Sequence, residues 1–243
     1  MEQQLIVHAG AQRIPRAELA ALPVPPATDT FKPIPHHEII QALVETLGFR
    51  HIGVFSDEYA VTPDGMRLFG VLNLETSFDG CRFVIGIRNS NDKSMRLAMT
   101  VGYRVFVCDN LAFQGDFTPV LAKHSKNVSL IDTIALGVER MQRNFEPMQK
   151  HVLQWKGTQI ADSYAKLVIY RAFVEAELDV PRHLARDVHH AYFQPTEADF
   201  QSRTLWSLEN AFTATVKRLE PITYFKATAK LGAFFNSIQE VQS

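Results

Sequence analysis

Cysteine is scarce in this chain, with only Cys81 and Cys108 among 243 residues. Two thiols are too few for a secreted disulfide scaffold, and their spacing matches no pattern of zinc ligands. No window approaches 18 uninterrupted apolar residues, and residues 1–10 lack the basic flank and apolar run of a signal peptide. We therefore expect a protein of the reducing cytoplasm that does not enter a membrane.

Familiar motifs of nucleotide and ester chemistry are also missing. The sequence contains neither a Walker loop, nor a Gly-x-Gly-x-x-Gly after a strand, nor a serine nucleophile elbow. Adjacent histidines occur at His36-His37 and His189-His190, but neighbours on a helix point about 100° apart and do not form the i, i+4 pair of a zinc site. We interpret residues 36–38 as a polar helix start, and we expect no metal and no cofactor.

Length and composition indicate a globular protein with a sizeable core, since 46% of the residues are hydrophobic and 21% are charged. The formal net charge of −1 hides an uneven distribution. Residues 1–79 hold 5 Lys and Arg against 10 Asp and Glu, residues 80–130 hold 7 against 3, and residues 131–243 hold 13 against 13. The local basic excess is a feature that can attract phosphates or nucleic acid, although it also suits an ordinary solvated surface.

The pattern of the first half predicts an antiparallel sheet. Residues 1–35 form an extended, proline-rich segment, and residues 36–48 have helical spacing. Strand patterns follow over residues 51–61, 66–76, 81–89 and 97–108. Their short connections, among them Thr62-Pro63-Asp64-Gly65 and Asp79-Gly80, allow hairpins but no parallel crossover.

The second half predicts helices. An apolar face runs from Ile131 to Phe145, and further helices are expected near residues 158–178, 182–192, 202–219 and 223–240. The fold class is therefore α+β: an antiparallel sheet of about four or more strands followed by a helical C-terminal half. We divide the chain into the segment 1–35, the sheet with its leading helix at 36–127, and a helical part at 128–243 that packs on the sheet, in the same domain.

The most informative stretch is the polar loop between the third and fourth predicted strands. Basic and amide side chains gather there and at the adjoining strand ends, where scaffolds often display functional groups. If the guanidinium groups of Arg88 and Arg104 share a face, they could hold phosphates, and Tyr103, Phe106 and Phe113 could stack on bases if exposed. The candidates for phosphate or nucleic-acid binding are Arg88, Asn89, Ser90, Lys93, Arg96, Arg104, Asn110, Lys123 and His124.

A catalytic interpretation is the alternative. Cys108 could act as a nucleophile with His124 as its base, and Asp92 and Asp109 could assist a phosphodiester- or nucleotide-processing enzyme. A cysteine that ends an apolar strand is more often a small buried hydrophobic residue. The sequence alone assigns no catalytic residue beyond these two candidates, Cys108 and His124.

Residues 88–94 resemble the polar loop of the phage- and plasmid-like proteins grouped as domain-of-unknown-function family 932. Gly102, Arg104 and the strand end at residues 108–110 match the glycine, the basic residue and the Cys-x-Asn corner of that family. Residues 123–125 resemble its Arg-His-Thr-type element, and residues 205–213 its Trp-x-x-x-Asn-Ala-x-Thr element. Asn91 and Lys93 depart from the His and Gly usual in the loop. The resemblance implies a setting in mobile elements and supplies no mechanism.

These observations favour a nucleic-acid-binding protein of a mobile element, with single-stranded DNA binding or annealing as its function and a homo-oligomer as its state. Besides the enzyme described above, an interaction protein that binds a host factor or a nucleotide signal is a further alternative. The layout of helix, antiparallel strands and helices is also similar to that of phage single-strand annealing proteins, an analogy at the level of fold alone.

Overall fold

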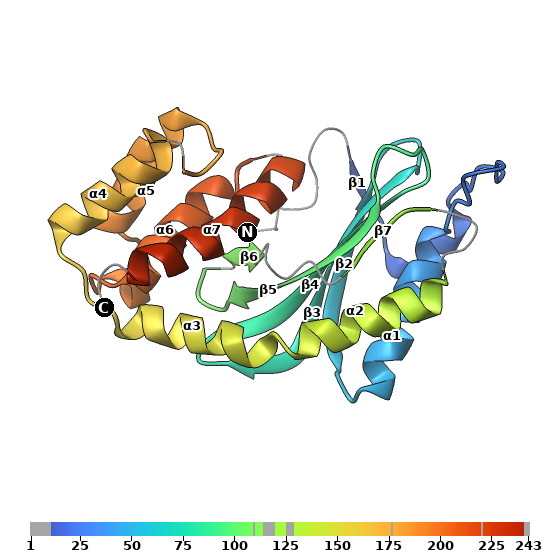
Figure 1. Ribbon diagram of the computed structural model, residues 1–243, viewed down its shortest axis with the longest axis horizontal. Coiled ribbons are helices and arrows are strands. Elements are labelled where there is room, and N and C mark those ends of the chain that lie inside the picture. Colours follow the sequence, from blue (N-terminus) through green and yellow to red (C-terminus); the bar gives the residue numbers. More distant parts are fainter. Residues whose placement is uncertain are drawn as a thin grey trace. The chain divides into compact units, whose positions relative to one another are not determined.

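The computed structural model describes residues 11–108, 110–113, 120–124, 129–175, 177–219 and 221–240 (Figure 1). Its strands precede most of its helices in the chain, and this segregation is typical of the α+β class. The sheet order is β1-β2-β3-β4-β5-β6. Strand β7 is not part of this order and pairs with β5. The strands are β1 (Gln12–Arg13), β2 (Val54–Val61), β3 (Arg67–Phe78), β4 (Cys81–Ser90), β5 (Leu97–Val105), β6 (Leu111–Phe113) and β7 (Val120–Ala122).

All four predicted strands are confirmed, within a few residues at their ends. The β3–β4 hairpin turns at Asp79 and Gly80, whose φ angles of 40° and 76° are both positive. Two such residues form the kind of turn that matches the twist of paired strands, which is why an Asp-Gly pair is a strong hairpin signal. The short strands β1, β6 and β7 were not predicted, because two or three residues carry no periodicity.

Of the seven α-helices among the described residues, six were predicted and α3 was not. The α-helices are α1 (His36–Phe49), α2 (Leu130–Gln142), α3 (Phe145–Gly157), α4 (Asp162–Phe173), α5 (Ala185–Phe193), α6 (Leu205–Val216) and α7 (Pro221–Glu240). Three 3-10 helices are η1 (Arg16–Ala21), η2 (Arg182–Leu184) and η3 (Ala198–Phe200). The single apolar face expected from Ile131 to Phe145 is wrong at its end: the side chain of Asn144 donates to the carbonyl of Arg140 at 2.8 Å, and α2 stops before Phe145 begins α3.

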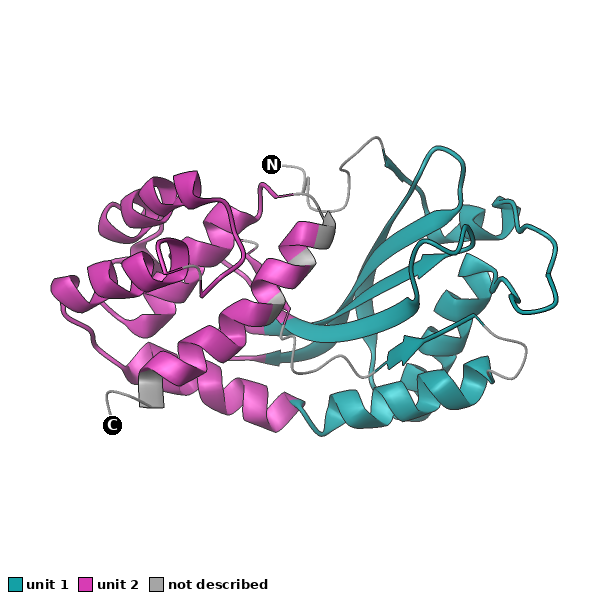
Figure 2. Cartoon of the chain, turned by 45° about the horizontal axis from the view of Figure 1, so that its top comes forward, with its two compact units in different colours: residues 1–77, 82–102, 117–144 teal, residues 78–81, 103–116, 145–243 magenta. Residues whose placement is uncertain are grey.

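The chain forms two compact units, which interleave along the sequence and are coloured separately in Figure 2. Unit 1 comprises residues 1–77, 82–102 and 117–144, and unit 2 comprises residues 78–81, 103–116 and 145–243. Because α2 belongs to unit 1, the units do not follow the division at residues 127 and 128 that the change from strand to helix pattern indicated.

In unit 1, α1 and α2 pack against one another and against the sheet (Figure 1). The apolar positions predicted for the first helix, including Ile39, Leu43 and Leu47, are fully buried. Gly137 of α2 lies so close to β7 that a Cβ atom there would be 2.3 Å from Val120. The sheet and α2 therefore approach each other at a position where only glycine fits.

Unit 2 has an aromatic core centred on α6. Phe212 stacks on Phe173 with ring centroids 5.6 Å apart, and it meets Phe235 edge to face at 5.7 Å. Trp155 of α3 joins this group through its ring contact with Phe235. Across the residues that the structure describes, no helix is long and apolar enough to cross a membrane.

Candidate functional site

A buried chain of hydrogen bonds joins His36, Asn89 and His124 in unit 1. The side-chain nitrogen of Asn89 donates to Nδ1 of His36 at 2.9 Å, and its oxygen lies 2.6 Å from Nε2 of His124. Nε2 of His36 in turn lies 3.1 Å from the carbonyl oxygen of Gly65. The three side chains come from the start of α1, the end of β4 and the segment after β7, so the network ties together parts of the chain far apart in sequence.

The hydrogen-bond partners determine which ring nitrogen of each histidine carries the proton. Asn89 also donates from Nδ2 to the carbonyl of Ile34 at 3.1 Å, which settles the orientation of its amide. Nδ1 of His36 is therefore an acceptor and its Nε2 carries the proton, while Nε2 of His124 donates to Asn89. Burial lowers the pKa of His36 to about 4 and also lowers the pKa of His124, so both rings are neutral at neutral pH.

Asn91 fixes the segment before α1 in the same way. Its side-chain oxygen accepts from the backbone nitrogen of Ile34 at 3.2 Å, and its own backbone nitrogen donates to the carbonyl of Met66 at 2.7 Å. Together with Asn89, it holds both backbone polar groups of Ile34. The end of β4 thus anchors the strap of residues 31–35 as well as α1.

Three exposed lysines lie around this anchor, and we call Lys32, Lys93 and Lys123 the lysine cluster. The ammonium of Lys93 is 5.1 Å from the ring centroid of Phe31, and that ring is 5.5 Å from the ring of His124. The backbone nitrogen of Lys32 donates to the carbonyl of His124 at 3.2 Å, and Lys123 directly precedes that histidine. The buried network therefore joins the three segments that carry these lysines.

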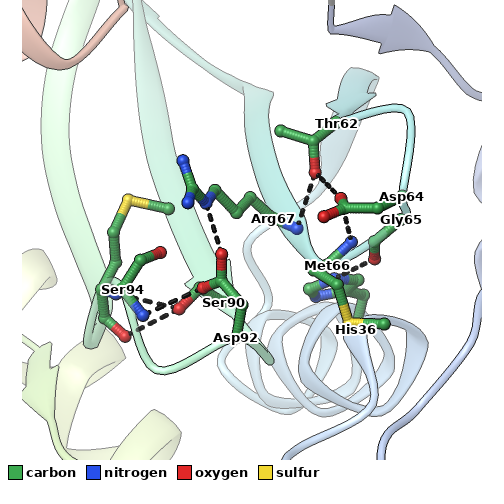
Figure 3. A network of polar contacts seen from close by, with 10 residues as sticks. His36, Thr62, Asp64, Gly65, Met66, Arg67, Ser90, Asp92 and Ser94 are labelled. Carbon is green, nitrogen blue, oxygen red and sulfur yellow. Dashed lines mark hydrogen bonds and ion pairs between the residues drawn. The ribbon is translucent and has the colours of Figure 1, made fainter.

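The loop that carries Lys93 is held at its base (Figure 3). Oγ of Ser90 accepts from the backbone of Met95 at 2.9 Å and donates to its carbonyl at 3.1 Å. Asp92 accepts from the backbone of Ser94 at 2.9 Å and from Nε of Arg67 at 2.6 Å. Although burial alone would raise it, these hydrogen bonds lower the pKa of Asp92 to about 2, so its charge is already matched by Arg67.

The remaining predicted cations have different surroundings. Arg96 is exposed on the same loop as Lys93, and Arg88 is half-buried on β4. Arg104 is 9% exposed and belongs to unit 2, whereas Arg88 belongs to unit 1. The candidates that the buried network brings together are thus Asn89 and His124, and the candidates Lys93 and Lys123 lie on the adjoining segments. Asp109, which the sequence also indicated, lies outside the described residues.

In unit 2, the Cys-x-Asn corner at residues 108–110 contacts the Trp-x-x-x-Asn element, which lies about one hundred residues further along the chain. Nδ2 of Asn110 lies 3.1 Å from the side-chain oxygen and 3.2 Å from the carbonyl of Asn210, and the thiol of Cys108 is 4.0 Å from the same side chain. Burial raises the pKa of Cys108 to about 11, so the thiol is protonated at neutral pH, which does not favour a nucleophile. His124, its proposed base, belongs to unit 1, where it donates to Asn89.

Beside Asn210, α6 carries a buried carboxyl group. Glu209 is 2% exposed, and its Oε1 accepts from the hydroxyl of Thr213 at 2.8 Å, while its Oε2 has no hydrogen-bond partner. Burial raises the pKa of Glu209 to about 7, and the hydrogen bonds from Thr213 and Tyr103 limit that rise. This group is therefore poised to change its charge near neutral pH.

Two of the three proposed stacking aromatics are core residues instead. Tyr103 and Phe113 are 2% and 1% exposed, and they pack against Trp206 and Tyr224 respectively. Phe106 is 50% exposed. Alternation along strands does not separate a buried aromatic from a displayed one when both faces of the sheet are covered.

Sequence reasoning missed the part played by His36 and Phe31. The helix start expected at residues 36–38 is confirmed, because α1 begins at His36, but the burial of this side chain was not predicted: it is 2% exposed and bonded to Asn89. A histidine preceded by Pro35 and followed by the apolar pair Ile39-Ile40 could have been assigned to the buried face of the helix. Within the described ranges, no group of three or more His, Cys, Asp or Glu side chains could hold a metal ion.

Comparison with known proteins identifies a family whose function is unknown. The family model described as a domain of unknown function, DUF932, matches residues 27–236. The match includes the strap, strands β2 to β7, the lysine cluster and most of the helices of unit 2. No curated protein and no solved structure matches the chain.

Proposed function

The chain belongs to the DUF932 family, and from this premise we propose that it binds single-stranded nucleic acid through the lysine cluster of unit 1. One observation carries the proposal: Lys32, Lys93 and Lys123 are exposed side chains from three segments that a buried network holds together. Such a group of cations fits a chain of phosphates, whose binding releases condensed counterions.

The local charge balance supports an anionic ligand. Arg96 adds a fourth exposed cation on the loop of Lys93, while Asp92 is already paired with Arg67. The strap of residues 31–35 contains no carboxylate, and Asp29 is the one nearest in sequence to Lys32. None of the three lysines takes part in an ion pair within the part of the chain that the structure describes, so their charges are available to a ligand.

A single strand fits this surface better than a duplex does. The cations lie on a strap, a hairpin loop and the exit of a short strand, whereas proteins that read duplex DNA commonly place a helix in the major groove. Contacts between lysines and phosphates follow the nucleic-acid backbone and do not distinguish one base from another. Annealing activity, self-association and a place in mobile elements are extensions of the same proposal.

Salt dependence tests the proposal. Fluorescence anisotropy with a labelled oligothymidine should give an affinity whose logarithm falls linearly with the logarithm of salt concentration. The triple variant Lys32→Gln/Lys93→Gln/Lys123→Gln should reduce the slope by about 2, because each phosphate contact to a single strand contributes about 0.7.

A matched control removes the same charge from unit 2. Lys150, Lys166 and Lys226 are exposed, and their replacement by Gln should leave the salt slope close to that of the parent protein. Equal slopes for the parent and the lysine-cluster variant would refute the proposed interface. Equal losses in both triple variants would indicate a response to net charge alone.

A further inference from the structure

The outer face of α1 in unit 1 is acidic and ends in an exposed aromatic ring. Its residues are three or four positions apart on the side opposite the buried stripe, and we call them the acidic face: Glu38, Gln41, Glu45 and Phe49. Phe49 is 86% exposed, and a Cβ atom on the adjacent Gly48 would have no neighbour within 4 Å in the described part of the chain. Neither glutamate forms an ion pair within the described ranges, although Glu45 accepts from Gln41 at 2.6 Å. The acidic face therefore presents two unpaired carboxylates and a large apolar side chain to solvent.

The outer face of α5 in unit 2 is basic. The 3-10 helix η2 runs directly into α5, and exposed side chains lie three and four residues to either side of Arg186. We call these five residues the basic face: Arg182, His183, Arg186, His189 and His190. Val188 and Tyr192 occupy the opposite side of the helix and are buried. Neither arginine forms an ion pair with another described residue, so both charges face solvent.

Charges of the other sign beside the two faces have partners of their own. Arg50, at the C-cap of α1, donates to Oε1 of Gln142 on α2 at 3.3 Å. Asp187, next to Arg186, lies 3.5 Å from Arg218. Each face thus keeps a single sign of charge, whereas an ordinary exposed helix mixes opposite charges at a spacing of three or four residues.

An apolar stripe borders the basic face. Three large side chains that are each about half exposed lie on one side of α4 and its C-cap: Leu167, Tyr170 and Val174. Helices α4 and α5 pack against each other (Figure 1). Lys166, directly before the first residue of the stripe, lies 5.6 Å from the ring centroid of Phe193, and the ring of His189 lies 4.4 Å from the same ring. The apolar stripe and the basic face therefore adjoin on the surface of unit 2.

We propose that the acidic face of one copy of this chain docks on the apolar stripe and basic face of a second copy. The occupant follows from complementarity: the chain itself carries an acidic helix with an apolar end, and unit 2 carries a surface with a cationic and an apolar part. Glu38 and Glu45 are seven residues apart, about 10 Å along a helix, and the same number of residues separates Arg182 from His189. Phe49 meets the stripe, as buried aromatic side chains commonly anchor an interface.

The proposed contact joins two different surfaces, so the copies associate head to tail. Such a heterologous interface leaves one unused surface at each end of a pair, and further copies can add until a ring closes or a filament grows. The contact goes beyond nucleic-acid binding and does not use the lysine cluster.

Sedimentation velocity of the full chain without nucleic acid tests the contact. The mean mass of the parent protein should exceed the 27.5 kDa of one chain, rise with protein concentration and fall with added salt. The variants Glu38→Lys/Glu45→Lys and Arg182→Glu/Arg186→Glu should each remain monomeric where the parent associates, because like charges then face each other. Phe49→Ser should weaken association about tenfold or more, as expected for loss of an aromatic anchor.

Mixing the two charge-reversed variants gives the sharpest test. Each keeps one native surface, so an equimolar mixture should form complexes that neither variant forms alone. The control Lys150→Glu/Lys226→Glu makes the same change of charge on exposed residues of α3 and α7 and should associate like the parent. Circular dichroism checks that the variants fold, and Glu38→Gln/Glu45→Gln and Arg182→Gln/Arg186→Gln provide milder versions that should weaken association.

Several results would overturn the proposal. A parent protein that stays monomeric at every concentration would remove the contact, as would association that both charge-reversed variants retain. A mixture that stays monomeric would exclude a heterologous pairing of these two faces, and equal loss in the control would indicate a response to net charge alone. The lysine-cluster variant should associate like the parent, so this proposal and nucleic-acid binding can fail separately.

Discussion

Replacement of Glu209 by Gln should remove a pH dependence from the stability of unit 2. The folded protein raises the pKa of this carboxyl group from 4.5 to about 7 by burying it in α6. A raised pKa means that folding favours the protonated form, so the stabilisation is complete below pH 4.5 and is lost as the pH rises through about 7. Gln keeps the shape and the acceptor oxygen but cannot ionise.

The magnitude follows from the two pKa values. At 1.36 kcal/mol for each pKa unit, the interval from 4.5 to about 7 corresponds to a loss of about 3 kcal/mol in the free energy of unfolding. The difference in unfolding free energy between the parent protein and Glu209→Gln should therefore change by about this amount between acid and mildly alkaline pH. Other titrating groups are common to both proteins and cancel in the difference.

Urea unfolding followed by tryptophan fluorescence is the suitable assay. Both tryptophans, Trp155 and Trp206, belong to unit 2, so the signal reports on the unit that contains Glu209. Measurements at several pH values between about 4.5 and 8.5 should show that the variant gains stability relative to the parent as the pH rises. A difference that stays constant with pH would refute the account of Glu209 as a buried carboxyl group that titrates near neutrality.

Further predictions concern packing and hydrogen bonding in unit 1. Gly137→Ala should destabilise the protein by roughly 2 kcal/mol in urea unfolding, because the new methyl group overlaps Val120. Gly48→Ala, also in a helix but with no neighbour within 4 Å of the new methyl group, should be neutral or slightly stabilising; similar losses in both variants would contradict the packing argument. Asn89→Ala should cost about 3 kcal/mol, since it leaves polar groups of both buried histidines and a backbone carbonyl without partners. An unchanged midpoint for that variant would contradict the anchoring role of the network.

Local signals predicted the framework of the fold. The Asp79-Gly80 pair fixed the position of the central hairpin, and the apolar spacing of residues 39–47 defined the buried face of α1. These features depend on residues close in sequence, whose conformational preferences act before any tertiary contact forms. They therefore remain visible in the sequence alone.

The grouping of the candidate residues was much less predictable. Asn89 and His124 were both singled out, but their hydrogen bond joins residues 35 positions apart, and the third partner, His36, was interpreted only as part of a polar helix start. Lys32 was not among the candidates, because its proximity to His124 depends on the path of the strap. Such contacts are set by tertiary packing, which periodicity and charge counts do not encode.

Lysine footprinting tests the central claim most directly. The protein would be acetylated with and without a saturating oligothymidine at low salt, and the labelling of each lysine would be measured by mass spectrometry. We predict that the oligonucleotide protects Lys32, Lys93 and Lys123 and leaves Lys150 and Lys166 of unit 2 as reactive as before. Binding that protects none of the three, or that protects all five alike, would contradict the assignment of the lysine cluster as the nucleic-acid interface.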